Sequence, residues 1–106
     1  MATGILGTTD LAATTNTTVY TVPSDTFSIV TISVCNRSSS NRDVRVALAA
    51  ADTPVNAEYV EYDTELVGNG TLERGGVVID ATKKVVVYAN STDVSVVVYG
   101  IETATS

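Results

Sequence analysis

The stretch KVVVYANSTDVSVVVYGI, residues 84–101, decides the fold of this chain. Two runs dominated by valine flank a polar turn at residues 90–93, and β-branched residues of this kind favour strands. Both runs are apolar at neighbouring positions rather than at alternate ones, which predicts strands buried on both faces. One of these faces belongs to the core of the fold. For the other face we expect an interface with a neighbouring subunit.

Five similar runs precede this hairpin, and the seven predicted strands cover residues 17–22, 27–35, 44–50, 59–66, 72–79, 84–89 and 94–101. The spacers between them are rich in Asn, Gly, Asp and Pro, which favour turns, and none is long enough for a crossover helix. In the fourth run, alternation predicts Val60, Tyr62 and Leu66 on the buried face. The fold class is therefore all-β: one antiparallel β-sandwich of about seven to eight strands, jelly-roll-like or immunoglobulin-like.

The 106 residues fit a single domain. Residues 1–16 lack a convincing period and are predicted to form an extended N-terminal arm, with the sandwich domain at residues 17–106. The arm is either a flexible terminus or a segment that adds to a neighbouring subunit. Phe27 is the only Phe and Trp is absent, so the core is expected to be thin and completed by neighbouring subunits.

The composition argues against an enzyme, because the chain has no His and only one Cys. We expect no catalytic residue, no cofactor and no bound metal, and we expect Cys35 to be a buried strand residue. A net charge of −6 opposes binding to nucleic acid or to an anionic membrane. The N-terminus does not resemble a secretory signal, and no apolar run is long enough to span a bilayer.

Two local patterns have competing interpretations. Carboxylates at positions 58, 61, 63 and 65 could contribute to a Ca²⁺ site, but side chains two residues apart on a strand lie about 7 Å apart, which favours a solvated face. The pair Gly75 and Gly76 interrupts a predicted strand, which indicates a bend or bulge.

Five stretches of the chain resemble small structural proteins of tailed bacteriophages, especially those that infect cyanobacteria and other marine bacteria. These stretches are residues 14–23 (TTNTTVYTVP), 34–37 (VCNR), 58–63 (EYVEYD), 69–76 (NGTLERGG) and 84–89 (KVVVYA). The resemblance extends from about residue 14 to residue 102. Its motifs are typical of β-sandwich strands and turns rather than of active sites.

The resemblance implies a non-enzymatic virion structural protein, and the most specific expectation is a capsid decoration or cement protein at the particle surface. It would be synthesised in the cytoplasm of the host bacterium. The expected partners are further copies of the chain, in a homo-oligomer for which a trimer is favoured, and the major capsid protein or another virion protein. The candidate interface residues are Ile5, Leu6, Val86, Tyr88, Val97 and Tyr99.

Two alternatives remain open. The chain could be a tail, neck, baseplate or fibre component, which would use the same features in another part of the particle. It could also be a carbohydrate-binding adhesion module, because β-sandwiches present loops well and tyrosines can stack on sugars. The tyrosines concerned are Tyr20, Tyr59, Tyr62, Tyr88 and Tyr99.

Overall fold

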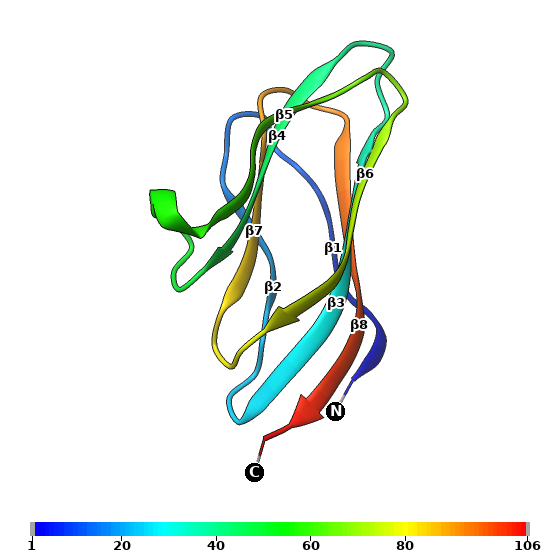
Figure 1. Cartoon of the computed structure of the whole chain (residues 1–106). Coiled ribbons are helices and arrows are strands. Elements are labelled where there is room, and N and C mark those ends of the chain that lie inside the picture. The colour runs from blue at the N-terminus through cyan, green and yellow to red at the C-terminus, as the bar shows by residue number, and fades with distance from the viewer. Residues whose placement is uncertain (1, 106) are drawn as a thin grey trace.

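The computed structural model describes residues 2–105 and shows eight strands in two facing layers (Figure 1). The one helical element among these residues is a single 3-10 turn, and no helix there is long and apolar enough to span a membrane. The elements are β1 (Thr3–Asp10), β2 (Thr17–Thr21), β3 (Thr26–Asn36), β4 (Arg42–Ala49), η1 (Asn56–Glu58), β5 (Tyr59–Leu66), β6 (Thr71–Ile79), β7 (Lys84–Ala89) and β8 (Val94–Ala104).

All seven predicted strands are present as β2 to β8, so the all-β sandwich is confirmed. Their bounds differ from the predicted ones by a few residues at some ends. The largest difference is in β8, which continues to Ala104.

The sandwich has two antiparallel four-stranded sheets, which we call sheet A (order β1-β8-β3-β6) and sheet B (order β2-β7-β4-β5). The strands pair as if the whole chain were one long hairpin with its tip between β4 and β5. The pairs are β1·β8, β2·β7, β3·β6 and β4·β5. Successive pairs of this hairpin alternate between the two sheets. This is the jelly-roll arrangement, so the strand order distinguishes it from the immunoglobulin-like alternative.

The N-terminal segment differs from the expected arm. Thr3–Asp10 is extended, but it forms strand β1 at the edge of sheet A and pairs with β8 of the same chain. The segment therefore belongs to the sandwich, and the expected boundary at residue 17 does not separate an arm from a domain. Met1 of the expected arm and Ser106 of the expected domain lie outside the described residues.

A glycine in β1 explains why this strand escaped recognition. A Cβ at Gly7 would lie 2.3 Å from the carbonyl oxygen of Val19, so the close approach of β1 to β2 requires glycine at this position. In the sequence, glycine weakens a strand prediction because it has no side chain to pack. In the structure Gly7 is nevertheless needed for close packing.

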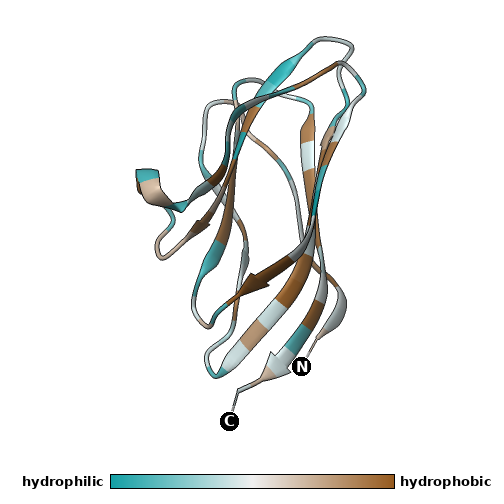
Figure 2. Cartoon of the chain, in the orientation of Figure 1, coloured by the Kyte–Doolittle hydropathy of each residue, from teal (hydrophilic) through white to brown (hydrophobic). Residues whose placement is uncertain are grey.

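The space between the sheets is filled mainly by valine. Figure 2 shows hydrophobic positions recurring along strands of both sheets. Every strand except β1 contributes at least one fully or nearly fully buried apolar side chain to this core, and β1 contributes the partly buried Leu6. Valine has few rotamers to lose on burial in a strand, which suits a thin core. The core residues include Val22, Val30, Ile32, Val34, Val44, Val46, Ile79, Val85, Val87, Val94, Val96 and Val98.

The predicted irregularity at Gly75 and Gly76 is confirmed as a β-bulge. These two residues of β6 stand opposite the single residue Thr31 of β3, and Gly76 has a positive φ of 67°. The extra residue shifts the alternation of β6, so that Val77 and Ile79 pack inward while Val78 faces outward.

We expect the substitution Gly100→Ala to destabilise the sandwich by about 3 kcal/mol or more, because it forces an overpacked contact at a sheet position. A Cβ at Gly100 would lie 2.0 Å from the carbonyl oxygen of Ile29 and 2.8 Å from Cα of Val30. The control is Gly75→Ala, whose Cβ would meet only the Thr31 hydroxyl at 3.5 Å. Urea unfolding of the two variants measures the difference, and equal stabilities would contradict this account of the β3–β8 contact.

Candidate functional site

The six candidate interface residues fall in three different places. Ile5, Val97 and Tyr99 lie on the outer face of sheet A, where Ile5 pairs directly with Tyr99. Leu6 instead packs against the core, and Val86 and Tyr88 lie on the outer face of sheet B. The structure therefore brings half of the predicted set together on one surface.

The outer face of sheet A carries most of the large apolar side chains that the described residues expose. Ile5 is 72% exposed, Val78 is 64% exposed and Ile101 is 43% exposed. The strand register aligns these residues in two neighbouring rows across the sheet, because directly paired residues of adjacent strands share a face. The rows are Thr3–Ile101–Ile29–Val78 and Ile5–Tyr99–Thr31–Gly75.

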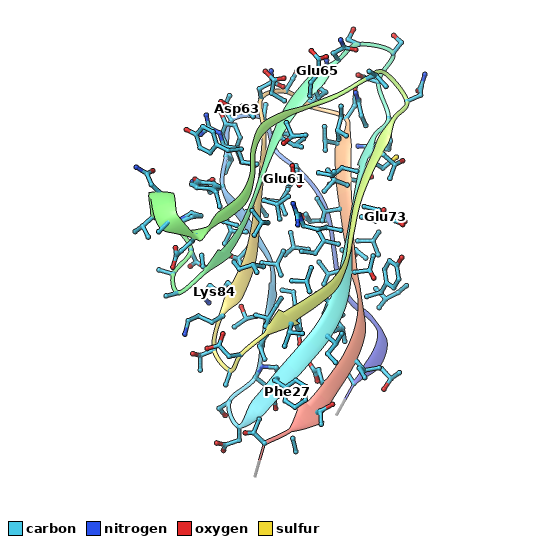
Figure 3. The ribbon with its side chains drawn as sticks, viewed as in Figure 1. Phe27, Glu61, Asp63, Glu65, Glu73 and Lys84 are labelled. Atoms are coloured by element: carbon cyan, nitrogen blue, oxygen red, sulfur yellow. The ribbon has the colours of Figure 1, made fainter. Side chains whose placement is uncertain are left out.

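Charge is almost absent from this face. The flanking rows are Phe27–Thr103 on one side and Thr8–Val97–Ser33–Glu73 on the other, so Glu73 is the one charged residue in the four rows. It lies on the edge strand β6, on the outer side of sheet A (Figure 3). Beyond these rows lies Cys35, which is half-buried rather than fully buried as expected.

The size of this face follows from strand geometry. Four strands about 4.8 Å apart, followed over six residues of about 3.3 Å each, span on the order of 400 Å². Patches of this size on a monomer are often functional. Ile29, Val78 and Ile101 were not among the predicted interface residues, although alternation along residues 27–35 could have identified Ile29.

Part of the outer face of sheet B is covered within the chain. Residues 50–58 connect β4 to β5, and Asp52 of this connection accepts a hydrogen bond from the Thr18 hydroxyl of β2 at 2.6 Å. Asp52 also forms an ion pair with Lys84 at 3.7 Å. On the same face Val86 is buried with Ala47 and Ala49, and Tyr59 packs against them. The apolar outer face of β7, which suggested a subunit interface, is thus satisfied within the chain.

A group of aromatic side chains lies beside the covered area, and we call Tyr59, Tyr62, Tyr88 and Arg45 the tyrosine cluster. The Arg45 guanidinium stacks 4.2 Å from the Tyr62 ring centroid and 4.6 Å from that of Tyr88. The rings of Tyr59 and Tyr62 meet edge to face, with centroids 4.9 Å apart. Cation–π and edge-to-face contacts of this kind hold aromatic rings in defined orientations.

Asp63 fixes the arginine of the cluster. Its Oδ1 accepts a hydrogen bond from Arg45 Nε at 2.6 Å, and its Oδ2 accepts one from Nη2 at 3.3 Å. This hydrogen bonding lowers the pKa of the Asp63 carboxyl and raises the pKa of Arg45. Both groups are therefore charged across the ordinary pH range, and the guanidinium already has a carboxylate partner.

Two β-bulges in β5 place the tyrosines of the cluster on one side. Tyr62 and Asp63 together stand opposite Arg45 of β4, and Val60 is an extra residue between the pairs Val46–Glu61 and Ala47–Tyr59. The prediction that Tyr62 faces the core is therefore wrong: its side chain is 56% exposed. Strict alternation fails here because each bulge reverses the parity of the residues that follow it.

An open cavity of about 460 Å³ adjoins the cluster and is lined by Asn56, Tyr59 and Tyr62. Its wall combines aromatic rings with an amide that can both donate and accept hydrogen bonds. The cavity is open to solvent, and Tyr62 at its wall is 56% exposed.

The four carboxylates considered for Ca²⁺ do not converge. Glu58 accepts hydrogen bonds from the backbone N–H groups of Ala50 and Val55, whereas Glu61 lies in the space between the sheets (Figure 3). There Glu61 accepts hydrogen bonds from the Thr64 hydroxyl and from the Arg74 guanidinium. The hydrogen bond from Thr64, followed in size of effect by the one from Arg74, lowers the pKa of Glu61. Among residues 2–105 no group of acidic, Cys or His side chains is arranged to hold a metal ion.

One buried tyrosine has a polar role inside the sandwich. The Tyr20 hydroxyl lies 2.6 Å from the Ser28 hydroxyl and donates a hydrogen bond to Glu102 Oε2 at 2.6 Å. Burial, and then the hydrogen bond to Glu102, raise the pKa of Tyr20 to about 12. Glu102 Oε1 also accepts a hydrogen bond from the N–H of Ala2. The hydrogen bonds of the Tyr20 hydroxyl join β2 of sheet B to β3 and β8 of sheet A. They engage the side chains of Tyr20, Ser28 and Glu102.

Comparison with family models, with curated proteins and with solved structures gave no match to this chain. Two surfaces on opposite sides of the sandwich are the candidate functional sites of this chain. They are the apolar outer face of sheet A and the tyrosine cluster on sheet B.

We expect Tyr20→Phe to lower the free energy of unfolding by about 1–2 kcal/mol at neutral pH, because the hydrogen bond to the Glu102 carboxylate is lost. The pKa of Tyr20 rises from its ordinary value of 10.0 to about 12 on folding. The stability that Tyr20 adds is thus complete below pH 10 and is lost as the pH rises towards 12, since the unfolded chain releases the proton first.

Urea unfolding at neutral pH and between pH 10 and about 12 measures this effect for both proteins. Wild-type protein should lose more stability over the alkaline interval than Tyr20→Phe does. Parallel losses in the two proteins would show that the Tyr20 hydroxyl does not link the sheets as described.

Proposed function

We propose that this chain is a non-enzymatic structural protein of a tailed-phage virion, most specifically a capsid decoration or cement protein. In this proposal it attaches to the particle through the outer face of sheet A. The sequence resemblance to small virion proteins supports the class of function. The outer face of sheet A, with its exposed apolar side chains and a single charged residue in its four rows, supports the mode of attachment, and it is the observation on which the proposal depends.

The composition of the face supports a protein partner. A chain with twelve acidic residues has one of them in the four rows that cross sheet A. Exposed apolar area costs free energy in water, so a face of this kind is stabilised when a complementary protein surface covers it. Jelly rolls occur among viral capsid domains and lectins, which is an analogy at the level of the fold alone.

The size of the face supports repeated attachment rather than a tight isolated pair. A contact of on the order of 400 Å² on each partner is about half of a standard protein interface, which buries about 800 Å² on each side. Single contacts of this size are weak, but many copies at symmetric positions bind with high avidity. In this proposal the chain binds the shell protein through sheet A, and contacts between copies, as in a trimer, add to the affinity.

We expect the double substitution Val78→Glu and Ile101→Glu to abolish incorporation into particles while leaving the fold intact. Both side chains are exposed, so their replacement changes the free energy of unfolding by about 0.5 kcal/mol or less. Burying the introduced charges against a partner would cost several kcal/mol. The copy number of each variant in purified particles, determined by quantitative mass spectrometry, measures incorporation.

The control is Val67→Glu, which introduces one such charge at a 60% exposed valine outside sheet A's outer face. It should be incorporated at the wild-type copy number. Full incorporation of the double variant would rule out attachment through this face.

A cryo-electron microscopy reconstruction of the particle distinguishes the possible positions. Decoration predicts density for this chain at symmetric positions over the shell, with sheet A against it. Density confined to the tail, neck or baseplate would retain the structural role but assign it to the alternative component. Absence of the chain from purified particles would exclude both.

A further inference from the structure

We propose that the tyrosine cluster and the adjoining cavity form a binding site for neutral saccharides. Tyr59 and Tyr62 supply apolar ring surfaces, and Asn56 lies at the wall of the same cavity. The C–H face of a pyranose ring packs against an aromatic ring, while its hydroxyl groups need donors and acceptors at the rim. The cavity offers this combination, and its volume of about 460 Å³ suits one or two sugar rings.

The local backbone is arranged to expose the two rings together. Without a bulge, positions 59 and 62 would face opposite sides of the sheet, since their spacing is odd. The extra residue Val60 and the bulge at Tyr62 and Asp63 bring both rings to the outer face. Asp63 adopts a positive φ of 51° at this bulge, which is uncommon for a residue other than glycine. Bulges and strained residues of this kind concentrate at functional sites.

The rings of the cluster are also held in place before any ligand binds. Tyr59 packs on the buried patch of Ala47, Ala49 and Val86. The Arg45 guanidinium stacks on the ring of Tyr62. A prearranged aromatic surface loses little side-chain entropy on binding. Tyr62 nevertheless remains more than half exposed, so a ring face is available to a ligand.

The charges around the site favour a neutral ligand. The positive charge of Arg45 is already paired with Asp63, so it is not free to bind a carboxylate or phosphate. The Asp63 side chain is 46% exposed, and its oxygens can accept further hydrogen bonds from sugar hydroxyls. The chain carries a net charge of −6, which opposes anionic sugars. Neutral hexoses and their oligomers therefore fit the site best.

The position of the site determines which way it faces on the particle. This part of the inference rests on the proposed attachment through sheet A. The tyrosine cluster lies on the outer face of sheet B, and η1 projects from that side of the sandwich (Figure 1). If the outer face of sheet A is against the shell, the saccharide site points away from it. Copies repeated over a particle would then present many weak sites to a glycan-covered surface.

Titration of the ¹⁵N-labelled full chain with glucose, galactose, mannose, maltose, cellobiose and lactose, followed by NMR, tests the site. At least one of these sugars should give saturable shifts at the Asn56 side-chain amide and at Arg45 Nε, with a dissociation constant of about 1 mM. Tyr62→Ala should weaken this binding about tenfold, the loss expected for one aromatic contact, whereas Tyr62→Phe should retain it.

The control is Val67→Ala, which shortens another exposed side chain and should bind as wild type does. Absence of saturable shifts with all six sugars would overturn the proposal, as would binding that Tyr62→Ala leaves unchanged. The Tyr62 variants keep the buried residues of the fold, and their backbone spectra verify this. Because the titration uses the isolated chain, its outcome is independent of whether sheet A attaches to a particle.

Discussion

The interior of this sandwich is made mainly of valine, and this thin core constrains the rest of the structure. Short branched side chains let the two sheets approach closely, and at Gly7, which lies against Val19 of the other sheet, only glycine fits. The core is completed by polar side chains rather than by large apolar ones. Tyr20 links the two sheets, and the buried Asn36 donates hydrogen bonds to the carbonyls of Ser40, Leu66 and Val67.

The chain has more apolar strand surface than this core can accommodate, and the two outer faces deal with the surplus differently. On sheet B, Ala47, Ala49 and Val86 are buried with Tyr59 packed against them, and Asp52 accepts a hydrogen bond from Thr18 nearby. On sheet A, the rows that contain Ile5, Ile29, Val78 and Ile101 remain exposed in the described part of the chain. The apolar residues on the outer face of sheet B are thus buried within the chain, whereas those on the outer face of sheet A would be stabilised by a partner.

The sequence was sufficient to predict the strands from residue 17 onward, because β-branched runs and polar turns carry a strong local signal. It was insufficient for β1, whose glycines weaken that signal, although one of them, Gly7, makes a close contact visible only in three dimensions. Of the candidate interface residues, Ile5, Val97 and Tyr99 share one face, whereas Leu6 packs inward and Val86 is buried on sheet B. The tyrosine cluster was obscured by the bulges in β5, since alternation predicts Tyr62 on the wrong side. The composition named Tyr59, Tyr62 and Tyr88 as sugar-stacking candidates, yet nothing in it showed that they meet at Arg45.

The pairing of the first strand with the last has a consequence for how the protein is made. Strand β1 obtains its hydrogen-bonded neighbour only from β8, which is synthesised after the other seven described strands, and β2 likewise waits for β7. Pairings between distant parts of a chain form slowly, because the loop between them must close first. The growing polypeptide therefore stays without its native sheet A edge until β8 has been synthesised, with apolar strands open to wrong partners. The time before β8 becomes available, and protection of the nascent chain by a chaperone during that time, would then determine the yield of folded protein more than its final stability does.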